Sequence, residues 1–354
     1  MTVLIFPSSL EASVAYAQQL RRRRLKMVGA SSLEQDPYID QYDSWLQLPF
    51  IHEENFIPAL KDALDRHNVS SIFTPHAPTY LRLIDLKGDL KNVEILGQAP
   101  YRLQMDRVRQ AYEKAALISA VQSPKGEEIE NGASFIAGLL DQATHLYGEC
   151  SHEKILAMAK IFNDCPKGDI VEIGTFFGKS ALILNRLAVH YDIGVTLACD
   201  PWSCHESIQY DSSQVIQDLS RHWDWHLVFK GFLMQAQGCH AGKFNYLRQT
   251  SLQAWEIYQS ASIVESKEFG STPLAGKIAV LHLDGNHDEH AVAADFAHWS
   301  QKLVPGAWII FDDYQWSQGN GPQIVADRLL KEQPQKIDHH FVSGGALFVK
   351  LKGR

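Results

Sequence analysis

The chain contains 354 residues, of which 45% are hydrophobic and 21% are charged. This composition is typical of folded proteins, and the length predicts two or three domains. The formal net charge of −8 argues against a nucleic-acid-binding protein, which would present a basic surface. The N-terminal residues do not read as a signal peptide, and no run reaches the about 20 apolar residues of a membrane span. We expect a cytoplasmic protein with no membrane or nucleic-acid partner.

The cysteines do not suggest a disulfide framework or a structural zinc site. They are odd in number, and no two of them form a CxxC pair. This usage fits a reducing compartment. The five cysteines are Cys150, Cys165, Cys199, Cys204 and Cys239.

The first hundred residues alternate between short apolar runs and segments with helical periodicity. Strands separated by helices predict a mostly parallel sheet with right-handed crossovers. We therefore predict a small Rossmann-like α/β domain over residues 1–98. The expected strands are residues 3–7, 26–30, 45–50, 71–74 and 93–96, and the expected helices are residues 10–24 and 55–67.

This segment resembles the N-terminal domain that precedes the ATP-grasp portion of carbamoyl-phosphate synthetases and biotin carboxylases. The matching residues are 3–9, 27–30, 72–75 and 96–100, the last followed by Asp106 and Arg107. No ATP-grasp nucleotide domain follows, so the resemblance implies a fold rather than ATP binding. Residues 99–149 read as a helical connector, with helices over 105–119 and 132–145 and a polar loop over 125–131.

Four consecutive arginines, residues 21–24, end the first predicted helix. A basic run can bind nucleic acid, but cations also stabilise the C-terminal end of a helix. Because the rest of the chain is acidic, we favour the second interpretation.

A glycine-rich turn begins the second half of the chain. The predicted strand 169–174 carries Glu172 and ends at Gly174, and a loop through Phe176 and Gly178 leads to Ser180 and a helix. Glycines allow a ligand to approach the backbone, and the helix N-terminus favours an anion. NAD, FAD and S-adenosylmethionine sites share such turns. The acidic strand end and a spacing other than GxGxxG favour S-adenosylmethionine.

Further candidate cofactor residues follow the next two strands. Asp200 ends the strand 195–199, where a carboxylate can accept the ribose hydroxyls, although it could instead cap a loop. Trp202 is a candidate for stacking near the adenosyl group, and Thr250 and Ser251 follow the strand where adenine would lie. The aromatic-rich residues 201–240 are either a lid or a crossover helix.

Acidic side chains also end the strands 278–283 and 307–311. Asp284 follows the first, and Asp312 and Asp313 follow the second. Parallel strands place their carboxyl ends on one edge of a sheet, where ligands bind. Three carboxylates there match the oxygen ligands that Mg²⁺ prefers.

Residues 150–354 resemble class I S-adenosylmethionine-dependent methyltransferases. The stretch LHLDGNHDEHAVAADFAHWSQKLVPGAWIIFDDY, residues 281–314, resembles metal-dependent O-methyltransferases that modify sugar hydroxyls of macrolides and aminocoumarins. The resemblance implies a Rossmann-like sheet closed by an antiparallel hairpin over residues 341–351. It also implies Mg²⁺ or another divalent cation on Asp284, Asp312 and Asp313, and His287 as general base. Glu172, Gly174 and Gly178 would then shape the methionine pocket, with Asp284 also at the cofactor.

The predicted function is methyl transfer from S-adenosylmethionine to a hydroxyl of a small-molecule acceptor, a natural product or a sugar. One alternative is a metal-free N-methyltransferase, and another is a binding or assembly module that holds the adenosyl ligand without turnover. A non-heme iron site on His282 and Asp284 with a later histidine is a further alternative. Alternatively, His287 has no catalytic role and only caps the helix that follows it. The sequence leaves open whether the chain forms a homo-oligomer.

Overall fold

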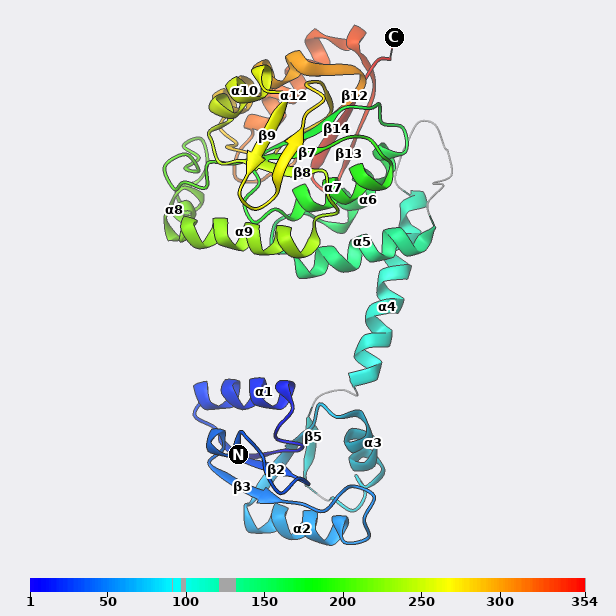
Figure 1. The fold of residues 1–354 in the computed structure, drawn as a ribbon, viewed down its shortest axis with the longest axis vertical. Coiled ribbons are helices and arrows are strands. Elements are labelled where there is room, and N and C mark those ends of the chain that lie inside the picture. The colour runs from blue at the N-terminus through cyan, green and yellow to red at the C-terminus, as the bar shows by residue number, and fades with distance from the viewer. Residues whose placement is uncertain (91, 97–99, 121–131, 354) are drawn as a thin grey trace. The chain divides into compact units, whose positions relative to one another are not determined.

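The computed structural model describes residues 1–90, 92–96, 100–120 and 132–353. The chain divides into two compact units, residues 1–109 and 110–354 (Figure 1). The predicted boundary at residue 98 and the predicted loop over 125–131 lie outside the described residues. The division into 1–98, 99–149 and 150–354 therefore stays a prediction.

The first unit is an α/β domain built on a five-stranded, entirely parallel sheet in the order β3-β2-β1-β4-β5. The five predicted strands and two predicted helices are all present, and α3 was not predicted. The elements are β1 (Thr2–Ile5), α1 (Glu11–Arg22), β2 (Lys26–Ser31), η1 (Ile39–Gln41), β3 (Ser44–Gln47), α2 (Phe56–Arg66), β4 (Val69–Phe73), α3 (Ala77–Asp85) and β5 (Glu94–Leu96).

Alternation along the strands gives this sheet two buried faces. Val3 and Ile5 pack with α1, whereas Leu4 packs with α2 and α3 on the other face. The buried runs of β1 and β2 are therefore continuous in sequence, as expected for a parallel sheet covered on both sides.

The second unit contains a seven-stranded sheet in the order β13-β14-β12-β11-β6-β7-β8. Strands β12 to β8 are parallel, and β14 is antiparallel to both β12 and β13, which confirms the predicted closing hairpin. Pro305 and Gly306 lie inside the strand that contains residues 307–311. The strands are β6 (Asp169–Ile173), β7 (Thr196–Cys199), β8 (Phe244–Leu247), β11 (Ile278–Leu283), β12 (Leu303–Phe311), β13 (Ile337–Ser343) and β14 (Ala346–Leu351), and a separate hairpin pairs β9 (Ile263–Ser266) with β10 (Gly270–Pro273).

Helices cover both faces of this sheet. One core cluster joins α5, α6 and α7 to one face, and a second joins α10, α11 and α12 to the opposite face (Figure 1). Phe232 of α9 is fully buried and belongs to a further core cluster. The helices are α4 (Pro100–Ala116), η2 (Leu117–Ala120), α5 (Ala133–His145), α6 (His152–Phe162), α7 (Lys179–His190), α8 (Gln214–His222), α9 (Trp225–Cys239), α10 (Ser251–Ser260), α11 (Glu289–Trp299), η3 (Ser300–Lys302), α12 (Gly321–Glu332) and η4 (Pro334–Lys336).

None of the helices in the described ranges combines the length and the apolar character that a membrane span requires.

Candidate functional site

Four adjacent parallel strands end in one row at the carboxyl edge of the seven-stranded sheet. Ladder hydrogen bonds fix this row: Asp284 N donates to Ile173 O at 2.8 Å, and Asp312 N donates to Leu283 O at 3.0 Å. Gly174 N likewise donates to Cys199 O, at the end of β7, at 2.9 Å. The predicted residues of four separate sequence segments therefore meet at the edge where α/β sheets bind ligands.

Two glycines shape the turn after β6. Gly174 has φ +84°, and a Cβ atom there would lie 2.0 Å from the carbonyl oxygen of Asp284. Gly178 has φ +89° and directly precedes α7, where a Cβ atom would lie 2.8 Å from Phe232. Both positions need the left-handed conformation and the missing side chain that glycine supplies. Phe176, between them, also has a positive φ of 51°.

A cavity of about 680 Å³ opens at this edge. Its size is within the range of small-molecule sites. Most of the predicted site residues line it: Gly174, Phe176, Gly178, Ser180, Asp200, Thr250, Ser251, Asp284, His287, Asp312 and Asp313. Residues that sequence reasoning did not place there also line it: Glu149, Trp223, Trp225, Asp295 and Trp316.

Asp200 holds the glycine turn in place. Its Oδ2 accepts the backbone N–H groups of Thr175 and Phe176, both at 2.9 Å, and its Oδ1 accepts the N–H of Trp202 at 2.6 Å. Burial raises the pKa of this carboxyl, although the three backbone donors oppose the shift. The structure thus shows the loop-capping role that the sequence left open, and ribose binding stays a prediction.

Trp202 does not line the cavity, so the expectation that it stacks near the adenosyl group is corrected. Its side chain is 2% exposed and packs against Phe229 and Phe232, with ring centroids at 4.9 and 4.7 Å. The indole N–H donates to Phe176 O at 2.7 Å. Trp202 therefore supports the glycine turn from the core side, and Trp223 and Trp225 supply the aromatic surface of the cavity.

Glu172 is also absent from the lining of the cavity, contrary to the expectation that it shapes a ligand pocket. Its side chain points along the sheet to His282 on β11, and Oε1 lies 2.9 Å from Nδ1. Both side chains are fully buried. Burial disfavours protonated His282, but the neighbouring carboxylates of Asp312 and Glu172 outweigh that effect and raise its pKa to about 9. Glu172, His282 and Asp284 also place one ligand atom each within 4.8 Å of the others, so the iron alternative on His282 and Asp284 stays open.

Lys154 of α6 forms a buried ion pair with Asp312. Their side chains are 2% and 7% exposed. Burial opposes both charges, but mutual attraction and the neighbouring His282 hold the pKa of Asp312 well below its usual range. The other oxygen of Asp312 accepts the N–H of Asp313 at 2.9 Å, so both oxygens of this predicted metal ligand are engaged.

Asp284, His287 and Asp313 form a separate group that could hold a metal ion. One ligand atom from each lies within 4.8 Å of the others. His287 Nε2 lies 3.8 Å from Asp284 Oδ1 and 3.5 Å from Asp313 Oδ2. Both ring nitrogens of His287 are buried without a hydrogen-bond partner in the described part of the chain. A buried, unsatisfied imidazole beside two carboxylates fits a divalent cation.

The electrostatics of this group depend on burial. Burial raises the pKa values of Asp284 and Asp313 and lowers that of His287. The charge of Asp312 raises the pKa of Asp284 further. Clustered carboxylates at a cavity therefore repel one another until a cation or a proton offsets their charge.

Thr250 and Ser251, predicted to lie near adenine, already have partners. Thr250 caps α10, with its hydroxyl 3.4 Å from Gln253 N, and Ser251 accepts the indole N–H of Trp299 at 3.0 Å. They line the cavity while stabilising their own helix.

Residues 171–314 match the family model described as a methyltransferase domain. The chain contains a methyltransferase domain. The matched residues include the glycine turn, Asp200, Asp284, His287 and the pair Asp312–Asp313. All of these line the cavity described above.

One curated relative is the uncharacterized protein y4gI of Sinorhizobium fredii (strain NBRC 101917 / NGR234). It is 24% identical over 145 residues, which are 41% of this chain. The chain spans only 13% of that relative's length.

Solved structures of methyltransferases are also similar to this chain. The O-methyltransferase NovP is 14% identical, with 57% of this chain and 80% of that one covered and a TM-score of 0.40. The calicheamicin methyltransferase CalS11 is 11% identical over 72% of this chain and 94% of that one, also with a TM-score of 0.40. MycE of the mycinamycin pathway, in complex with Mg, SAH and mycinamycin VI, is 13% identical. The match covers 61% of this chain and 53% of that one, with a TM-score of 0.35. Similarity at this level transfers neither a substrate nor a cofactor to this chain.

Proposed function

We propose that this protein is an S-adenosylmethionine-dependent O-methyltransferase that requires Mg²⁺ or another divalent cation and acts on a hydroxyl of a small molecule. One observation carries the proposal: the glycine turn before α7 and the group Asp284, His287 and Asp313 line the same cavity. A donor site and a hydroxyl-activating site that share one cavity are what direct methyl transfer requires.

The turn formed by Gly174 and Gly178 would accept the donor. Gly174 and Gly178 allow the tight, left-handed backbone of the turn, and the α7 N-terminus presents N–H groups that attract a carboxylate such as that of a methionine moiety. Asp200 keeps this turn in shape through Thr175 and Phe176. In this proposal Asp200 is chiefly a positioning residue.

The cation would be held by Asp284 and Asp313, whose side chains are 20% and 38% exposed. When bound, it supplies a Lewis acid that lowers the pKa of an acceptor hydroxyl. Asp312 is less accessible and already neutralised by Lys154, so its place among the ligands stays a prediction from the sequence.

His287 would take the proton from the acceptor. Burial lowers its pKa, so the imidazole is neutral near pH 7 and can accept a proton. Its two ring nitrogens have no hydrogen-bond partner in the described residues that would compete for this role. The acceptor oxygen then forms a bond to the methyl carbon as the carbon–sulfur bond breaks, and S-adenosylhomocysteine leaves with the electron pair on sulfur.

Trp316 would form one wall of the acceptor site. Its ring centroid lies 5.1 Å from that of His287, in an edge-on arrangement, and it lines the cavity. A flat apolar surface beside a proton acceptor suits a ring-shaped acceptor that carries hydroxyl groups, such as a sugar or a phenol-containing natural product. We also propose a cytoplasmic setting, because the cysteines are all unpaired thiols.

The test is transfer of a labelled methyl group from S-adenosylmethionine to a panel of hydroxylated sugars and phenols. We expect transfer that stops on chelation and returns when Mg²⁺ is added back. Activity unchanged in chelator would contradict the metal requirement and favour N-methylation. Binding of the donor with no turnover on any acceptor, together with a stable protein partner, would instead favour an assembly module.

A further inference from the structure

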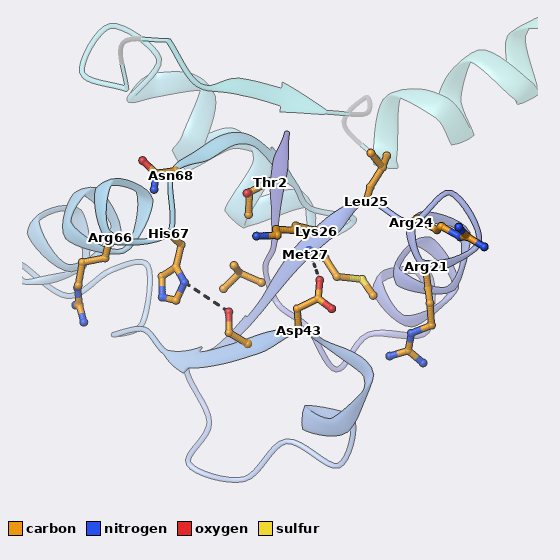
Figure 2. A pocket seen from close by; sticks show the side chains of 12 residues that line it. Thr2, Arg21, Arg24, Leu25, Lys26, Met27, Asp43, Arg66, His67 and Asn68 are labelled. Carbon is orange, nitrogen blue, oxygen red and sulfur yellow. Dashed lines mark hydrogen bonds between the residues drawn. The ribbon is translucent and has the colours of Figure 1, made fainter.

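A basic cavity in the first unit has no role in the proposed reaction. It has a volume of about 670 Å³ and lies at the amino-terminal ends of β1 and β2, between the carboxyl-terminal ends of α1 and α2 (Figure 2). Its lining includes Arg21, Arg24, Lys26, Arg66 and His67.

The cavity contrasts with the rest of the chain. Acidic residues outnumber basic ones by 41 to 33 overall, yet Asp43 is the sole carboxylate among the lining residues. That carboxylate accepts the N–H of Met27 at 2.9 Å, so it is held against the backbone. The overall amino-acid composition of the chain, which is acidic, therefore does not explain the excess of positive charge in this cavity.

Helix ends account for part of this charge. Arg21 donates to the carbonyl oxygen of Gln41 at 2.6 Å, and Arg66 pairs with Asp62 one turn earlier on its own helix. Cations near the carboxyl end of a helix are stabilised by its dipole without any ligand.

Arg24 and Lys26 are not explained in this way. Arg24 lies beyond the end of α1 in the left-handed conformation, with φ 57°, and Lys26 begins β2. Within the described residues neither side chain has a hydrogen-bond or ion-pair partner. Figure 2 shows Lys26 between the two arginines of the α1 end and the residues Arg66 and His67 of the α2 end.

We propose that this cavity binds a phosphorylated small molecule through a diphosphate or similar multivalent phosphate group. Guanidinium groups bind phosphate oxygens in pairs, and an ammonium group adds a compact point charge. His67 lies on the same wall, with Nδ1 3.5 Å from Ser44 Oγ, and offers its other ring nitrogen. The volume admits a ligand of nucleotide size, and the charge of several cations suits more than one negative charge.

The site is separate from the methyltransferase cavity and does not rest on the proposed function. All of its lining residues lie between Thr2 and Asn68, within the first unit. The resemblance of this unit to a domain that precedes ATP-grasp enzymes implies no site at this edge, because ligands of open α/β sheets usually bind at the opposite, carboxyl edge.

The test is calorimetric titration of the full chain with inorganic pyrophosphate, with uridine diphosphate and with uridine, without divalent cations. We expect saturable one-to-one binding of the first two and none of uridine. Binding should weaken as salt rises from about 0.05 M to about 0.3 M, because exposed charges are screened. Lys26→Gln and Arg24→Gln should each weaken binding by about tenfold or more.

Lys87→Gln is the matched control, since Lys87 is an exposed lysine of the same unit outside the cavity. It should leave the affinity unchanged, and all three variants should keep the melting temperature of the parent protein. No saturable binding of either phosphate compound would overturn the proposal. Equal weakening by Lys87→Gln, or binding of single-stranded RNA or anionic vesicles in place of both compounds, would overturn it as well.

Discussion

The ammonium group of Lys154 and the carboxylate of Asp312 form an ion pair in the interior of the second unit. The lysine comes from α6, and the aspartate lies 158 residues later at the end of β12. His282 Nε2 lies 3.5 Å from the same oxygen of Asp312, Oδ2, and Nδ1 of His282 forms a hydrogen bond with Glu172. Opposite charges therefore alternate from Lys154 through Asp312 and His282 to Glu172, and Asp312 also lines the cavity.

Removal of Lys154 should destabilise the domain. Lys154→Met leaves Asp312 buried without its partner, and loss of one member of a buried pair costs about 3–5 kcal/mol. The free energy of unfolding from denaturant titration checks this. The double variant with Asp312→Asn should regain part of the loss, and Lys331→Met, at an exposed lysine of α12, should change little. An unchanged free energy of unfolding in Lys154→Met would show that the ion pair is not formed.

Asp312 and Asp313 should respond differently to amide substitution. Asp313→Asn should keep the fold but weaken Mg²⁺ binding about tenfold or more, because it removes one of the accessible carboxylates. Asp312→Asn should mainly lower the free energy of unfolding, because it leaves Lys154 unpaired. Metal titration alongside denaturation of both variants makes the comparison. The reverse pattern would show that Asp312 is the cation ligand predicted from the sequence resemblance.

Gly174→Ala should abolish donor binding. Its Cβ would overlap the backbone of Asp284, and its φ of +84° disfavours any residue with a side chain. Overpacking of this kind costs about 1–3 kcal/mol in the free energy of unfolding. The matched control is Gly138→Ala in α5, where a Cβ meets no atom within 4 Å. This substitution should raise the free energy of unfolding by about 0.5–1 kcal/mol, because alanine favours a helix over glycine. Equal donor affinity in both variants would contradict the assignment of the turn.

Asp295 should make stability depend on pH. Burial raises the pKa of this carboxyl to about 6, although a hydrogen bond from Ser251 opposes the shift. In the unfolded chain the pKa is about 3.9, so the folded state loses stability as pH rises from about 4 through about 6. The free energy of unfolding of Asp295→Asn should therefore exceed that of the parent by about 3 kcal/mol at pH 8 and equal it at pH 4. A larger difference at pH 4 than at pH 8 would contradict this sign.

The strand ends could be predicted from sequence because each depends on a local pattern. An apolar run followed by an acidic residue marks the end of a buried strand, and the parallel arrangement then brings Asp200, Asp284 and Asp312 to one edge. The same reasoning placed the glycine turn correctly. It also placed the strands and helices of the first unit, apart from α3.

The misplaced residues depend on tertiary contacts that a strand pattern does not contain. Glu172 points to His282 because β6 and β11 pair in a register that sets these two residues side by side. Trp202 turns into the core because the left-handed backbone at this residue, with φ 45°, directs its side chain toward α9.

The importance of Lys154 left a trace in the sequence that could have been used. It occupies the same helical stripe as Met158 and Ile161, which are buried. A lysine on the apolar stripe of a helix implies a buried partner, because an unpaired buried charge is too costly. The sequence does not identify that partner, since it lies in a different segment of the chain.

The most direct test of the proposed donor site is calorimetric titration of the wild-type protein with S-adenosylhomocysteine, in the presence and absence of Mg²⁺. We expect saturable one-to-one binding that Gly174→Ala abolishes and that Asp313→Asn leaves in place. Absence of any binding to the wild-type protein under both conditions would contradict it.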